Sequence, residues 1–184
     1  MVMNQNTCAF TGHRPHKLPW KDNEDDPRCI ALKRTLAEQI AALAESGVTS
    51  FYSGGADGVD CWAALIVLAL REKNPALTLH CILPHEGQAD RWSHSARERY
   101  DSILKQANSV EYVSRAYYDG CLIERNHRLV DSAGLLLAVY SGTRRSGTGS
   151  TVNYAQKTGR EIIVIDPITL TVSRWNPIPR RTDG

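Results

Sequence analysis

Short apolar runs alternate with stretches of helical periodicity along most of the chain, and this alternation restricts the fold more than any other feature. The apolar runs predict strands at residues 7–11, 49–53, 77–83, 109–114, 134–140 and 161–166. The stretches that follow them predict helices at residues 26–47, 58–73, 88–107, 119–133 and 149–159. Strands that are apolar on both faces are typical of a parallel sheet covered by helices on both sides. The chain is therefore predicted to form an α/β fold around a mostly parallel sheet.

The first predicted helix and the last predicted strand have clear end signals. Asp26 is a candidate N-cap, Pro27 suits the first helical position, and Gly47 is a candidate C-terminal stop. Apolar residues recur between these ends at helical spacing and predict the buried face, namely Leu32, Leu36, Ile40 and Leu43. Residues 167–175 follow a predicted turn and predict a return strand, which would form an antiparallel C-terminal edge of the sheet.

Composition limits the size and the partners of the protein. With 184 residues, of which 42% are hydrophobic, the chain is predicted to form a single domain over residues 1–184. The net charge of +2 argues against a nucleic-acid partner, because binding a phosphate backbone needs a basic surface. There is no apolar run of about 18 residues, so no membrane partner is expected. The first residues also lack the basic and apolar regions of a secretory signal.

The cysteines and histidines show neither a redox motif nor a metal-binding pattern. Five cysteines occur without a C-x-x-C pair, and six histidines occur without the spacing of metal ligands. An odd number of unpaired cysteines suits a reducing compartment. We therefore expect a cytoplasmic protein with reduced thiols in its core and no metal site.

Three loops that follow predicted strands share an unusual composition. Residues 11–15 read TGHRP, residues 53–60 read SGGADGVD, and residues 140–151 read YSGTRRSGTGST. In a parallel sheet such loops leave the carboxyl edge, where α/β proteins bind their ligands. Glycine allows close approach, a following helix offers free N–H groups, and arginine binds phosphate through two donors. The three loops together predict a site for a ligand that carries phosphate.

The candidate ligand-binding residues of these loops are Thr11, Gly12, His13, Arg14, Ser53, Gly54, Gly55, Asp57, Gly58, Ser146, Gly147 and Thr148. We expect Gly54, Gly55, Gly147 and Thr148 to bind phosphate oxygens through backbone N–H and hydroxyl groups, and Arg14 to neutralise the phosphate charge. The alternatives are a surface position for Arg14, a turn-stabilising role for His13 and an N-cap role for Asp57. Arg144 and Arg145 are either anion contacts or a solvated loop tip.

Neither standard phosphate-binding motif is present. The chain has no G-x-x-x-x-G-K-[ST] sequence, which disfavours a P-loop nucleoside triphosphatase. The GGADGVD stretch is not G-x-G-x-x-G and follows the second strand, which disfavours an ordinary dinucleotide dehydrogenase.

Four motifs occur in a characteristic order: TGHRP, YSGGADGVDCWAA, ERNHRLVDSAGLLLAVY and SGTGSTVNYA. Their combination resembles the YpsA-like family of the SLOG superfamily over roughly residues 7–166. The resemblance implies a Rossmann-like, nucleotide-binding domain of the SLOG type. It also implies a small-molecule nucleotide or an ADP-ribose-like compound as ligand, and pairing into a homo-oligomer.

Two branches of the superfamily bear on individual residues. DNA-processing protein A, which binds single-stranded DNA, has a stretch similar to the one that runs from Ser53 to Asp60. The LOG-type phosphoribohydrolases cleave the N-glycosidic bond of nucleoside monophosphates. Arg125 falls at the position of an arginine in those enzymes, and Gly147 and Thr148 fall at their G-T pair. Arg125 and the adjacent Asn126 are therefore further candidate ligand-binding residues, and Arg125 is expected to neutralise the phosphate charge together with Arg14. Thr151 stands where their catalytic glutamate would be, and threonine cannot act as a carboxylate does.

These observations predict a nucleotide binder with a sensor or regulatory role, and two alternatives stay open. The first alternative is an N-glycosidic hydrolase with Asp57, Asp60 and Arg125 as candidate catalytic residues, although Thr151 argues against the LOG mechanism. The second alternative is a single-stranded nucleic-acid binder, against which the near-neutral charge argues.

Overall fold

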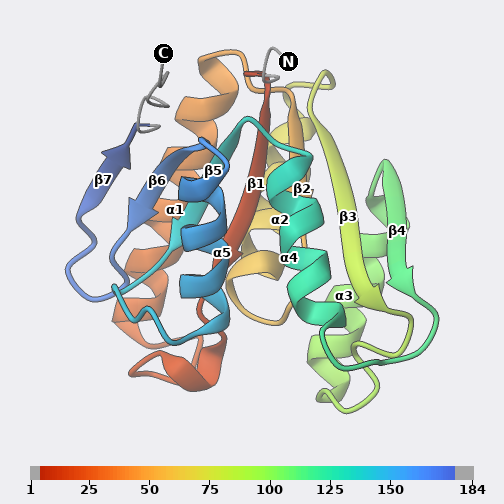
Figure 1. The fold of residues 1–184 in the computed structure, drawn as a ribbon. Helices are drawn as coiled ribbons and strands as arrows, with labels where there is room; N and C mark the ends of the chain where they lie inside the picture. Colours follow the sequence, from red (N-terminus) through yellow and green to blue (C-terminus); the bar gives the residue numbers. More distant parts are fainter. Residues whose placement is uncertain (1–4, 177–184) are drawn as a thin grey trace.

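The computed structural model describes residues 5–176, which form a seven-stranded sheet with helices on both faces. The strands are β1 (Thr7–Gly12), β2 (Ser50–Ser53), β3 (Thr78–His85), β4 (Ser109–Ser114), β5 (Leu135–Val139), β6 (Glu161–Ile165) and β7 (Val172–Trp175). The helices are α1 (Pro27–Glu45), α2 (Val59–Arg71), α3 (His94–Gln106), α4 (Cys121–Asp131) and α5 (Gly147–Lys157), with a short 3-10 turn at Pro15–Lys17. Figure 1 shows the arrangement.

The strand order is β4-β3-β2-β1-β5-β6-β7, so β1 is the central strand. Strands β1 to β6 pair in parallel, and β7 pairs antiparallel with β6 at the edge. The predicted α/β fold with a mostly parallel sheet and a C-terminal antiparallel edge is confirmed. The return strand is shorter than predicted, because Asp166 accepts N–H bonds from Ile168 and Thr169 and so closes a turn there.

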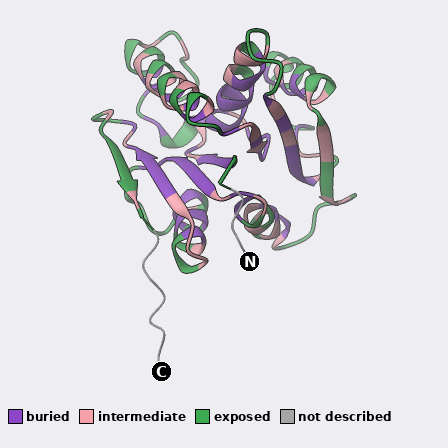
Figure 2. Cartoon of the chain, turned by 90° about the horizontal axis from the view of Figure 1, so that it is seen from above, coloured by how far each residue is buried: buried purple, intermediate pink, exposed green. Residues whose placement is uncertain are grey.

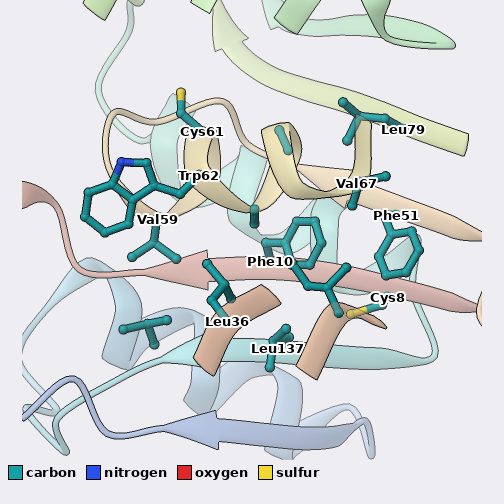
Figure 3. Packing of buried hydrophobic residues seen from close by; sticks show 14 of the residues in the cluster. Cys8, Phe10, Leu36, Phe51, Val59, Cys61, Trp62, Val67, Leu79 and Leu137 are labelled. Atoms are coloured by element: carbon teal, nitrogen blue, oxygen red, sulfur yellow. The ribbon is translucent and has the colours of Figure 1, made fainter. Parts of the chain in front are cut away.

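Alternate strand residues face two separate cores, as side chains in a strand must. Phe10, Leu137 and Ile163 belong to the core beneath α1, α2 and α3, whereas Leu136 and Val164 belong to the core beneath α4 and α5. In the first core Phe10 and Phe51 stack with ring centroids 5.7 Å apart. Figure 3 shows this core with α2 above the sheet, and Figure 2 shows buried strands between layers of helices that are exposed on their outer sides.

The ends of the helices agree with the sequence in most places. Asp26 accepts an N–H bond from Arg28 as the N-cap of α1, and the predicted face of α1 is buried. The third helix begins at His94 rather than at residue 88, because Ser93 caps it by accepting from the Ala96 N–H. In residues 5–176 no helix is both long enough and apolar enough to cross a membrane.

Candidate functional site

A pocket of about 590 Å³ opens at the carboxyl ends of β1 and β5, at the lower edge of the sheet in Figure 1. The predicted residues Thr11, Gly12, His13 and Arg14 line it from the end of β1 and the loop after it. Further predicted residues line it from three helices and the capping residue of one of them: Asp60 (α2), Arg125 and Asn126 (α4), and Ser146, Gly147 and Thr148 (α5 and its N-cap). Residues far apart in the sequence therefore meet at one pocket, as a parallel sheet makes possible.

The charged side chains of the pocket are mostly cationic. Arg14, Lys17, Arg125 and Arg145 line it, and Asp60 is the one carboxylate among its lining residues in the described range. Lys17 was not a predicted site residue. Lys17 ends the 3-10 turn that starts at Pro15, and proline at the start of a turn in HRPHK was the available signal. An excess of positive charge in a concave site favours an anionic ligand.

The N-terminus of α5 points free donors into this pocket. Ser146 caps the helix, since its hydroxyl accepts from the Gly149 N–H at 3.0 Å and donates to the Thr143 carbonyl at 2.7 Å. The N–H groups of Gly147 and Thr148 have no partner within residues 5–176. A Cβ built on Gly147 would meet no atom within 4 Å, so the space beside this first residue of the helix is open. Such a helix start attracts phosphate through its free N–H groups and its dipole.

Arg125 and Asp60 form a buried pair in the wall of the pocket. Their side chains are only 5% and 7% exposed, and Arg125 Nη1 lies 3.9 Å from Asp60 Oδ2. The same Nη1 donates to the Gly54 carbonyl, and Arg125 Nε donates to Asn126 Oδ1 at 2.8 Å. Burial lowers the pKa of Arg125, and burial raises the pKa of Asp60 against the opposing effect of Arg125. Each of the two buried charges is therefore stabilised by the opposite charge of the other side chain.

The glycine-rich loop after β2 lies beside the pocket and contributes Ala56 to its lining. Ser53, Gly54, Gly55, Asp57 and Gly58 are not among the lining residues. The Ser53 hydroxyl donates to the Asp60 carbonyl at 3.0 Å and accepts from the Gly55 N–H at 3.1 Å. The loop thus fixes the start of α2, on which Asp60 stands.

The glycines of the first two loops also allow the loops to pack against each other. A Cβ on Gly12 would lie 2.5 Å from Val59 Cγ1, and a Cβ on Gly58 would lie 2.8 Å from Pro15 Cδ. A Cβ on Gly54 would lie 2.1 Å from Arg125 Nη1. Three of the predicted ligand glycines therefore have a packing reason that involves side chains of the protein itself.

Asp57 lies apart from Asp60 and is not the N-cap of α2, because Gly58 occupies that position. The Asp57 carboxylate instead accepts from Arg99 Nη2 at 2.8 Å and from the Gly58 N–H at 3.0 Å. Arg99 Nη1 also donates to Glu24 at 2.7 Å. This network ties the loop before α1 to the loop before α2, and it explains Asp57 without a ligand.

Thr151 is buried within α5, where it is 1% exposed and its hydroxyl donates to the Gly147 carbonyl at 2.9 Å. Thr151 does not line the pocket. In the described part of the chain no group of three His, Cys, Asp or Glu side chains could hold a metal ion. The cationic side chains of the lining suit an anionic group of a ligand. The single carboxylate, Asp60, suits a hydrogen-bond donor of the same ligand.

His13 connects the loops that follow β1 and β5. Its Nε2 accepts from the Ser141 N–H at 3.2 Å and lies 2.9 Å from the Ser141 hydroxyl, so this nitrogen carries no proton. Burial, with a smaller effect of Lys17, lowers the pKa of His13 below its ordinary value of 6.5. The neutral ring is therefore the form that holds the two loops together.

We expect the free energy of unfolding to fall as the pH drops below 6.5, and His13→Gln to reduce that fall. Because the folded pKa is the lower one, the unfolded chain takes up the proton first. The contribution of His13 is thus complete above 6.5 and is lost between 6.5 and the lowered folded pKa. Urea unfolding at several pH values checks this result. His16→Gln, at an exposed position, is the control, and equal pH profiles for wild type and His13→Gln would contradict the prediction.

Comparison with known proteins gives consistent matches over most of the chain. The model of the YspA SLOG family matches residues 8–170. The UPF0398 protein of Bacillus pumilus is 33% identical over 134 residues, which cover 72% of this chain and 72% of that protein. The UPF0398 protein of Halalkalibacterium halodurans is 30% identical over 152 residues, which cover 81% of this chain and 79% of that protein.

Two solved structures have a similar fold. DNA processing protein A from Streptococcus pneumoniae gives a TM-score of 0.57 at 14% identity, and the match covers 89% of this chain and 53% of that one. This chain therefore spans about half the length of that protein. The structural-genomics target TM1055 gives a TM-score of 0.55 at 16% identity, with 88% of this chain and 75% of that chain covered. At these identities the similarity concerns the fold.

Proposed function

The chain belongs to the YspA SLOG family, and on that premise we propose that it binds a nucleotide or nucleotide-derived phosphate in the pocket at the ends of β1 and β5. The role that suits such a binder is that of a sensor or regulatory protein. The described residues offer recognition groups in the pocket and no second carboxylate for catalysis.

One observation carries this proposal: unpaired N–H groups at the start of α5 face a pocket that Arg14, Lys17 and Arg145 also line. Backbone N–H groups, a helix dipole and arginine forks are the donors that phosphate prefers. Within residues 5–176, Arg14 and Arg145 form no ion pair of their own, so both are available to a ligand.

The volume of about 590 Å³ suits a ligand larger than inorganic phosphate. A nucleoside monophosphate or an ADP-ribose-like compound fills such a pocket and brings the negative charge that its lining favours. A hydrolase of the two-carboxylate type has weaker support. Asp57 is held by Arg99 outside the pocket, and Thr151 is bonded to its own helix.

We expect Arg145→Ala to weaken the binding of a nucleoside monophosphate about tenfold to hundredfold. This range corresponds to one charge-assisted hydrogen bond of about 1.5–3 kcal/mol. Isothermal titration calorimetry with the common nucleoside monophosphates and ADP-ribose measures the effect. Gly147→Ala is expected to weaken binding as well, because its Cβ would occupy open space at a residue that lines the pocket.

The matched control is Arg34→Ala, which removes an exposed arginine on α1 outside the pocket and should leave the affinity unchanged. Adenosine, which lacks phosphate, is expected to bind much more weakly than its monophosphate. The proposal fails if no compound of the panel binds, or if Arg34→Ala and Arg145→Ala weaken binding equally.

A further inference from the structure

Asp60 is an unusual residue for a pocket that attracts anions. It is 6% exposed, and it is the one carboxylate among the described residues that line the pocket. Its Oδ2 faces Arg125 Nη1 at 3.9 Å and accepts from the Ala56 N–H at 3.4 Å. Its Oδ1 has no hydrogen-bond partner in residues 5–176. This oxygen is not among the fully buried unpaired atoms of these residues, so a donor of a ligand in the pocket can reach it.

The neighbour of this carboxylate is an equally buried donor. Arg125 uses Nη1 for Gly54 and Nε for Asn126, and its Nη2 makes no hydrogen bond within the described residues. Arg125 and Asp60 both line the pocket, so an acceptor and a donor stand side by side there. A sugar hydroxyl can donate and accept at once, and two adjacent hydroxyls match such a pair better than an amino group, which only donates.

The negative charge of Asp60 restricts which part of the ligand can lie beside it. A phosphate group placed next to this carboxylate would be repelled, so the phosphate belongs at the start of α5. The part of the ligand at Asp60 must carry hydroxyl groups instead. In a ribonucleotide the 2′- and 3′-hydroxyls occupy the side of the sugar away from the 5′-phosphate.

We propose that Asp60, with Arg125 beside it, binds the ribose hydroxyls of the ligand and makes the pocket selective for ribonucleotides over deoxyribonucleotides. This inference rests on the proposed nucleotide binding and adds the sugar to it. Asp60 is then a residue that determines specificity, and the α5 N-terminus supplies the affinity for phosphate. A site built to hydrogen-bond a hydroxyl rejects the analogue that lacks it, because its polar groups then stay unpaired.

The test compares adenosine 5′-monophosphate with its 2′-deoxy and 3′-deoxy analogues by calorimetry on the wild-type chain and on Asp60→Asn. Wild type is expected to bind at least one deoxy analogue about tenfold or more weakly than the ribonucleotide, the effect of losing about 1.4 kcal/mol or more. In Asp60→Asn, where the acceptor has lost its charge, the ratio should fall to about threefold or less. Inosine 5′-monophosphate, which lacks the amino group of adenine, should bind wild type as adenosine monophosphate does.

The outcomes separate this inference from the proposal beneath it. If no nucleotide binds to wild type, nucleotide binding and sugar selectivity fall together. If ribo and deoxy forms bind equally, the assignment of Asp60 is wrong while the phosphate site stands. The assignment of Asp60 would also be wrong if the affinity depended on the amino group of adenine and not on the sugar hydroxyls. Should Asp60→Asn not fold, the wild-type ratios decide alone.

Discussion

Arg125→Ala is expected to lower the free energy of unfolding by about 3–5 kcal/mol, the cost of breaking one partner out of a buried ion pair. The substitution leaves the Asp60 carboxylate buried without its counter-charge and the Gly54 carbonyl without its donor. Urea unfolding at pH 7 measures the change. Arg128→Ala is the matched control on the same helix, because Arg128 forms an exposed pair with Glu124 whose loss should change the stability little.

The loss caused by Arg125→Ala should be smaller at acidic pH. Burial already raises the pKa of Asp60, and removing Arg125 takes away the main opposing effect. A raised folded pKa means that the folded chain binds the proton first, so stability is regained as the pH falls through that pKa. An Arg125→Ala chain as stable as Arg128→Ala at pH 7, where Asp60 of the wild-type chain faces Arg125, would show that the pair does not support the fold.

Gly12→Ala is expected to destabilise the chain by about 1–3 kcal/mol through overpacking at the junction of β1 and α2. The new Cβ would lie within 2.5 to 2.7 Å of the three side-chain carbons of Val59, which is 2% exposed. Figure 3 shows Val59 on the side of α2 that faces β1, so the clash has no room to relax outward. Thermal or urea unfolding measures the effect.

A second substitution separates overpacking from other causes. Val59→Ala removes the carbons that the new methyl group would strike, so the double variant Gly12→Ala/Val59→Ala should lose less stability than the sum of the single variants. Gly147→Ala is the glycine control, because a Cβ there meets no atom within 4 Å. Strict additivity of Gly12→Ala and Val59→Ala would contradict the packing explanation.

The layers of the fold were predictable because hydrophobic periodicity reports burial directly. The inner strands β1, β5 and β6 are buried apolar runs, and the face of α1 from Leu32 to Leu43 is buried as its spacing predicts. The start of α3 was missed because the residues from Gln88 to Trp92 continue an amphipathic pattern although they form turns. Ser93 was the available signal, since serine is a favoured N-cap.

The candidate site was only partly predictable. The topology of a parallel sheet predicts which loops line the pocket. It does not predict whether a given glycine contacts a ligand or packs against the protein. Gly54 approaches Arg125, 71 positions later in the chain, and such a distant neighbour leaves no local trace. Asp57 and Asp60 are close in sequence, yet one turns toward Arg99 and the other toward Arg125. Only the packing of α3 and α4 around the loop separates them.

The central claim is that the start of α5 holds a phosphate group, and the amide resonances of Gly147 and Thr148 report on it most directly. Titration of a ¹⁵N-labelled chain with adenosine 5′-monophosphate should move both resonances, since a phosphate would give partners to N–H groups that have none among the described residues. The resonances of Gly120 and Gly159, which are not among the residues that line the pocket, should stay in place. Unmoved Gly147 and Thr148 resonances at saturating nucleotide, with shifts elsewhere in the spectrum, would contradict the account.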